Sequence, residues 1–80
     1  MSPTVLHFGP YRFYFYSRDL AEPIHIHIVR DDNEAKFWLD PVRLAANHGF
    51  SAKELRKIEK LIHQNDDTIR RKWNEHLKQR

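Results

Sequence analysis

Residues 24–29 read Ile-His-Ile-His-Ile-Val, and this regular alternation constrains the fold more than any other segment of the chain. Successive side chains of a β-strand point to opposite faces of its sheet, so alternating apolar and polar residues indicate a strand with one buried face. The isoleucines would then face a core. The pattern predicts a half-buried strand that carries His25 and His27 together on its other face.

Other strand-like segments flank this one. Residues 11–16 form an aromatic run, and aromatic residues are favoured in β-sheets. Gly9 and Pro10 before the run predict a turn, which leaves residues 5–8 as a short partner strand. After an Asp- and Asn-rich segment typical of a hairpin turn, residues 35–39 alternate again and are expected to return as a strand.

The segment at residues 42–46 is ambiguous. It fits a last short strand, or a helical turn that Asp40 begins with Pro41 at the first helical position. We favour the strand. The sequence therefore predicts a three- or four-stranded antiparallel sheet in meander order, spanning residues 5–46.

The last part of the chain changes to helical spacing. Ser51 and Glu54 are spaced as a capping box, in which the serine hydroxyl accepts from the Glu54 amide and the glutamate side chain returns to the Ser51 amide. Apolar residues then recur every three or four positions, which is the period of an amphipathic helix. We expect two helices, at residues 52–63 and 66–78, that form a hairpin packed on one face of the sheet.

Together these patterns predict one small α+β domain over residues 1–80. The chain is 40% hydrophobic, which is too apolar for a disordered chain. No apolar run approaches the ~20 residues that cross a membrane. The first residues also lack the pattern of a signal peptide. We therefore expect a cytoplasmic protein with no membrane contact.

The expected core consists of apolar side chains on the inward faces of these elements. They are Phe13, Phe15, Ile24, Ile26, Ile28, Phe37, Leu39, Leu55, Ile58, Leu61, Ile62, Ile69 and Trp73. Isolated cores in chains of this length give only about 3–5 kcal/mol of stability. A partner chain, or a second copy of this one, would add to it.

The two histidines of the alternating strand are the first candidate for chemistry. The Cβ atoms of residues two apart on a strand lie roughly 6.5–7 Å from each other, and two imidazoles at that separation can converge on one metal ion or one phosphate. A metal site needs a third ligand, for which His7, Asp40 and His48 are the candidates. Because the chain has no cysteine, all ligands would be nitrogen or oxygen. The alternative is that His25 and His27 only line a half-exposed sheet face and stack on cross-strand aromatic residues.

Histidine titrates near neutral pH, so the pair could also act as acid and base on a phosphoester. Arginines commonly hold phosphate, and Arg12, Arg30 and Arg43 are the candidate phosphate contacts. Gly9 and Gly49 are the only glycines, which excludes a glycine-rich phosphate loop. No resident cofactor is expected, apart from the divalent metal that the histidines would bind.

Positive charge collects near the end of the chain. Residues 51–80 hold nine Lys and Arg against five Asp and Glu. Exposed faces of amphipathic helices usually carry such charge. Basic side chains combined with aromatic ones can also bind single-stranded RNA. The candidate surface for a partner or a nucleic acid comprises Tyr14, Tyr16, Trp38, Arg56, Lys60, Arg70 and Arg71.

Several segments of the chain resemble a known family. They are EPIHIHI at residues 22–28, AKFWLDPV at 35–42, N-x-G-F-S-x-x-E-L at 47–55, and W-x-E at 73–75. In this order they resemble the small bacterial proteins of the domain of unknown function 4160 family. Its members typically show Pro-Pro-His-x-His, and Glu22 stands here in place of the first proline. The resemblance implies a small α+β domain that is often encoded beside a second small protein, as in toxin–antitoxin pairs, and it implies no established reaction.

The leading hypothesis is a small interaction module, one component of a toxin–antitoxin-like pair, that binds a cognate small protein. The second is an RNA-cleaving or phosphoester-processing toxin that uses His25 and His27, with RNA as its partner. The third is a regulator that binds a metal through the same pair. Self-association is an alternative to a cognate partner.

Overall fold

The computed structural model describes residues 4–15 and 21–78, and it shows a single sheet followed by two helices. The elements in chain order are β1 (Thr4–Phe8), β2 (Tyr11–Phe15), β3 (His25–Arg30), β4 (Asn33–Leu39), β5 (Val42–His48), α1 (Ala52–Gln64) and α2 (Asp66–Lys78). The predicted α+β class is confirmed. The sheet has five strands rather than three or four, because residues 4–8 and 42–48 both pair with their neighbours.

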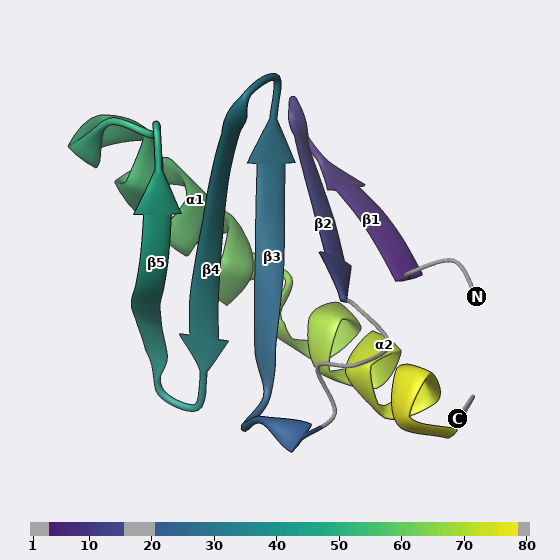
Figure 1. The fold of residues 1–80 in the computed structure, drawn as a ribbon. Coiled ribbons are helices and arrows are strands. Elements are labelled where there is room, and N and C mark those ends of the chain that lie inside the picture. Colours follow the sequence, from purple (N-terminus) through teal and green to yellow (C-terminus); the bar gives the residue numbers. More distant parts are fainter. Residues whose placement is uncertain (1–3, 16–20, 79–80) are drawn as a thin grey trace.

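The five strands form an antiparallel meander in which each strand pairs with the next one along the chain. The strand interpretation of residues 42–46 is confirmed, and pairing continues two residues further, to His48 opposite Glu34. A bulge between Lys36 and Phe37 shifts the register of β5 against β4. Both helices lie behind the sheet in Figure 1, so one sheet face has no helix on it.

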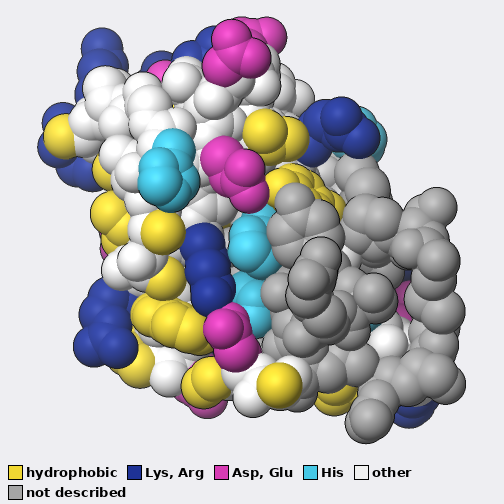
Figure 2. All heavy atoms as spheres, viewed as in Figure 1, with side chains coloured by type: hydrophobic (Ala, Val, Ile, Leu, Met, Phe, Trp, Pro, Cys, Tyr) yellow, Lys and Arg dark blue, Asp and Glu magenta, His cyan; other side chains and the backbone are white. Residues whose placement is uncertain are grey.

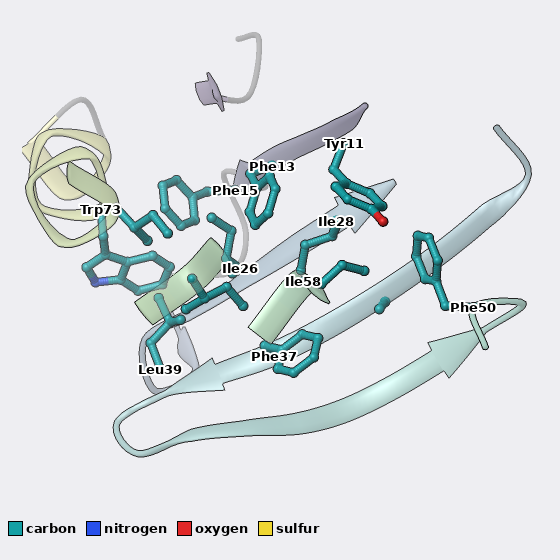
Figure 3. Close-up of a cluster of buried hydrophobic side chains, with 13 residues drawn as sticks. Tyr11, Phe13, Phe15, Ile26, Ile28, Phe37, Leu39, Phe50, Ile58 and Trp73 are labelled. Atoms are coloured by element: carbon teal, nitrogen blue, oxygen red, sulfur yellow. The ribbon is translucent and has the colours of Figure 1, made fainter. Parts of the chain in front are cut away.

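The core lies between the sheet and the helices. Side chains from β2, β3 and β4 meet those of α1 and α2 there, as Figure 3 shows for Phe13, Ile26, Phe37, Ile58 and Trp73. Most of the predicted core is buried, whereas three of its members are only partly buried and pack at its margin: Ile24, Leu55 and Leu61. Three hydrophobic residues outside the predicted set are also buried, Tyr11, Ala35 and Phe50, and so are two histidines, His25 and His76.

The start of α1 is attached to the sheet by a cluster of three polar side chains, which we call the Glu54 cluster. The Ser51 hydroxyl accepts from the Glu54 amide at 3.2 Å, so this half of the predicted capping box is confirmed. The Glu54 carboxylate does not return to Ser51. It accepts from Arg30 of β3 at 2.8 Å and from the Tyr11 hydroxyl of β2 at 3.0 Å.

The Glu54 cluster changes the protonation equilibria of its members. The hydrogen bond from Arg30 holds the pKa of Glu54 below its usual value, and it outweighs burial, which acts in the opposite direction. The same hydrogen bond raises the pKa of Arg30. Burial is the main cause that raises the pKa of Tyr11, and the hydrogen bond to Glu54 adds to it. At neutral pH Glu54 and Arg30 are therefore ionised and paired, and the Tyr11 hydroxyl keeps the proton that it donates to Glu54.

The two helices meet at Asn65. Its backbone N–H donates to the carbonyls of Leu61 and Ile62, and its side-chain amide donates to the Leu61 carbonyl at 2.8 Å. These hydrogen bonds end α1. Arg70 of α2 then donates to the carbonyl of Leu39, at the end of β4, at 2.8 Å. This contact fixes α2 against the end of the sheet.

Candidate functional site

The sheet face that neither helix covers is called here the open face. Alternation along the strands, together with the strand register, places these described side chains on it: His7, Arg12, Tyr14, His25, His27, Val29, Glu34, Lys36, Trp38, Arg43, Ala46 and His48. Figure 2 shows histidine side chains gathered in the middle of this face, beside basic and acidic ones. The predicted alternation of β3 is thus confirmed, with the isoleucines in the core and the histidines on the other side.

His25 and His27 lie side by side, with ring centroids 5.2 Å apart. His25 is nonetheless completely buried. Its Nδ1 lies 2.8 Å from the Pro23 carbonyl, and its ring contacts Trp38 and Trp73 at 5.6 and 5.5 Å between centroids. A side chain packed in this way cannot reach an external substrate, so in this structure His25 is a core residue at the end of the sheet.

His27 belongs to a contact group that spans three strands. The Tyr14 ring stacks on the His27 ring, with centroids 5.4 Å apart and planes 19° apart. The Tyr14 hydroxyl donates to Glu34 Oε2 at 3.0 Å, and His27 Nδ1 lies 3.9 Å from the same oxygen. The Tyr14–His27 contact matches the prediction that the histidines stack on cross-strand aromatic residues.

A hollow of about 250 Å³ opens beside this group. Its lining includes the ionisable side chains of His27, Glu34, Lys36 and His48. The Lys36 ammonium lies 2.6 Å from the Glu22 carboxylate and 4.6 Å from the centroid of the Trp38 ring. The hollow therefore brings two imidazoles, a carboxylate and an ammonium group to one place on the open face.

Of the three candidates for a third metal ligand, only His48 lines the same hollow as His27. His7 lies on β1 opposite Arg12, and Asp40 is exposed in the turn between β4 and β5. Across residues 4–15 and 21–78, no three histidine or acidic side chains are grouped so that they could hold a metal ion. Metal analysis of protein purified without chelator is the direct test of the metal hypothesis.

The candidate phosphate contacts divide between the two sides of the sheet. Arg12 and Arg43 are exposed on the open face. Arg30 points to the helix side, where it binds Glu54. The alternation of β3 is the reason, because an even-numbered position in this strand faces the helices. Arg30 therefore cannot assist His27.

The candidate partner surface is also divided. Tyr14 and Trp38 lie on the open face, while Arg56, Lys60 and Arg71 are exposed on the helices. Arg70 is held by Asp66 and the Leu39 carbonyl. Tyr16 lies outside the described residues.

Glu34 was not among the site residues predicted from the sequence. Glu34 alternates with Lys36 and Trp38, and this spacing was enough to predict that the three side chains lie on the same face of the sheet.

The fold and the open face define a two-layer α+β protein whose sheet presents aromatic, histidine and charged side chains on the side away from the helices. The family described as Domain of unknown function (DUF4160) matches residues 11–74, which include most of the sheet, all of α1 and most of α2. The chain belongs to this family. Comparison with curated proteins and with solved structures gives no match. No described helix is long and apolar enough to cross a membrane.

Proposed function

We propose that the open face binds a cognate small protein and that the two form a toxin–antitoxin-like pair. The observation that carries the proposal is the aromatic and histidine surface on the side of the sheet away from the two helices. Tyr14 and Trp38 are each only partly buried there, and both belong to the residue types enriched at protein interfaces. The gene arrangement implied by the family resemblance, with a second small protein beside this one, supplies a candidate partner.

The charge on the open face favours a protein partner over a nucleic acid. Lys36 is paired with Glu22, and Glu34 accepts from Tyr14. A surface that binds phosphate backbones would present cations without such acids beside them. Mixed charges around aromatic side chains instead suit a partner with both kinds of charge at its rim.

Calorimetric titration with the product of the neighbouring gene tests the proposal. Trp38→Thr keeps a residue that strands favour and removes the largest side chain of the open face, so we expect binding to weaken by about tenfold or more. Leu77→Thr is the matched control, since Leu77 is an exposed apolar residue on α2 (36% exposed). Two results contradict the proposal: both variants weaken binding to the same extent, or neither variant weakens it.

Phosphoester cleavage is a second candidate function, which the shared hollow of His27, Lys36 and His48 favours. One neutral imidazole would take the proton of an RNA 2′-hydroxyl, which then attacks the adjacent phosphorus. The other, protonated imidazole would give its proton to the departing 5′-oxygen, leaving a 2′,3′-cyclic phosphate. Lys36 would stabilise the negative charge on the phosphate. A partner on the open face would cover this hollow.

Incubation of the purified protein with single-stranded RNA tests this candidate. His27→Gln and His48→Gln should each lower the cleavage rate by about a hundredfold or more. His63→Gln is the control, because His63 is an exposed histidine on α1 that lies 3.7 Å from Glu59. Absence of cleavage by the wild-type protein, or cleavage that survives both substitutions, rules the candidate out.

A further inference from the structure

A second hollow lies on the helix side of the molecule, away from the open face. It measures about 390 Å³, between the β1–β2 turn and α1. The apolar part of its lining comes from Pro10, Tyr11 and Leu61, and the polar part from Lys57, Lys60 and Gln64. An apolar floor with cationic groups at its edge suits a ligand that combines a flat apolar group with negative charge.

The two lysines belong to a longer row of positive charge on α1. Lys53, Arg56, Lys57 and Lys60 are all exposed. Lys53 is three and four residues before Arg56 and Lys57, and Lys60 is four and three residues after them, so the four side chains lie along one face of the helix. At a rise of 1.5 Å per residue the row extends roughly 10 Å, from the start of the helix to the hollow. We call these four residues the α1 basic row.

The acids near the α1 basic row are already engaged. Glu54 binds Arg30 and Tyr11, and Glu59 lies 3.7 Å from His63 on the same helix. Lys57 is close enough to Glu54 to lower the pKa of that carboxyl, but the shorter contact of Glu54 is the one with Arg30. The row therefore keeps a net positive field toward solvent, in contrast to the mixed charges of the open face.

From this arrangement we propose that the α1 basic row and its hollow bind a single-stranded nucleic acid. A base lies on Pro10 and Leu61 in the hollow, and the phosphates on either side of it lie against Lys57 and Lys60. The Gln64 amide offers one donor and one acceptor to the edge of the base. The row continues beyond the hollow, so it fits an extended polyanion better than one isolated phosphate. This inference does not depend on the proposed protein partner, which occupies the other side of the sheet.

Fluorescence anisotropy with a labelled decauridylate tests this inference. The double variant Lys57→Gln/Lys60→Gln should weaken binding by about tenfold or more, and the slope of log K against log salt should become shallower by about 1.4. Arg71→Gln/Lys78→Gln removes the same charge from exposed positions of α2 and is the matched control. It should change the dissociation constant by no more than about twofold.

Two further probes separate a nucleic acid from other polyanions. A decamer of the same charge without bases should bind about tenfold more weakly than decauridylate, because it loses the contact with the apolar floor. A decaglutamate peptide should compete poorly. Absence of decauridylate binding, equal effects of the two double variants, or competition by decaglutamate as strong as that of unlabelled decauridylate would overturn the proposal. In the last case the site binds acidic protein segments.

Discussion

Arg30 Nη2 lies 2.8 Å from Glu54 Oε1, so a residue at the end of β3 ties the first turn of α1 to the sheet. The two residues are 24 positions apart in the chain. The Tyr11 hydroxyl of β2 donates a second hydrogen bond to the same carboxylate. The contact joins α1 to the side of the sheet that is opposite the open face.

The Glu54 cluster predicts a stability difference that depends on pH. Glu54 has a lower pKa in the folded chain than its ordinary value of 4.5, so its contribution to stability is present above that value and is lost as pH falls through the folded-state pKa. Glu54→Gln should therefore lower the melting temperature at about pH 7, and the difference from wild type should shrink below about pH 4. Circular dichroism melts across this range provide the measurement.

Glu59→Gln is the control for that experiment, because Glu59 lies on the exposed side of the same helix. It should change the melting temperature little at any pH in the series. A Glu54→Gln difference that stays constant down to about pH 3 would show that the carboxylate charge does not contribute through Arg30.

Gly49 predicts a local stability effect where β5 leads into α1. Its φ is +107°, and a Cβ at this position would clash with the side chain of Asn33. Gly49→Ala should lower the free energy of unfolding by about 1–3 kcal/mol. Gly9 also has a positive φ (+60°), but a Cβ added there would meet open space. Gly9→Ala should therefore lower the free energy of unfolding by only about 1 kcal/mol. Urea denaturation measures both, and a larger cost at Gly9 would contradict this account.

Arg70 predicts a contrast between two neighbouring arginines on α2. Arg70 binds Asp66 and the Leu39 carbonyl, whereas Arg71 is exposed. Arg70→Gln should destabilise the fold by about 1 kcal/mol, since it removes a charged hydrogen bond between α2 and the sheet. Arg71→Gln should stay within about 0.5 kcal/mol of wild type. Equal unfolding midpoints for the two variants would show that the Leu39 contact adds nothing.

Most of the fold could be predicted from local pattern. The alternation in β3 placed Ile26 in the core and His27 on the open face, because a strand has only two sides. The number of strands was underestimated because β5 is an edge strand with mostly exposed residues, including Leu44 (41% exposed), and therefore has no clear apolar face.

The candidate site was harder to predict because its contacts join distant segments. His25 and His27 look equivalent in sequence, yet His25 is completely buried and packs against Trp73 of α2, a contact that is set by helix placement. The partnership of Glu54 with Arg30 was missed for a similar reason. A capping box is a local motif, and it says nothing about a strand that ends 24 residues earlier.

The most direct test of the proposed function uses the two tryptophans of the chain, since Trp38 lies on the open face and Trp73 is buried in the core (6% exposed). Their indole N–H signals can be assigned in a ¹⁵N-labelled sample with Trp38→Phe and Trp73→Phe variants. The labelled protein is then titrated with the product of the neighbouring gene. We predict that the Trp38 indole signal shifts or broadens as the complex forms and that the Trp73 signal stays in place. A complex that leaves the Trp38 signal unchanged, or the absence of a complex, would contradict the assignment of the open face as the binding surface.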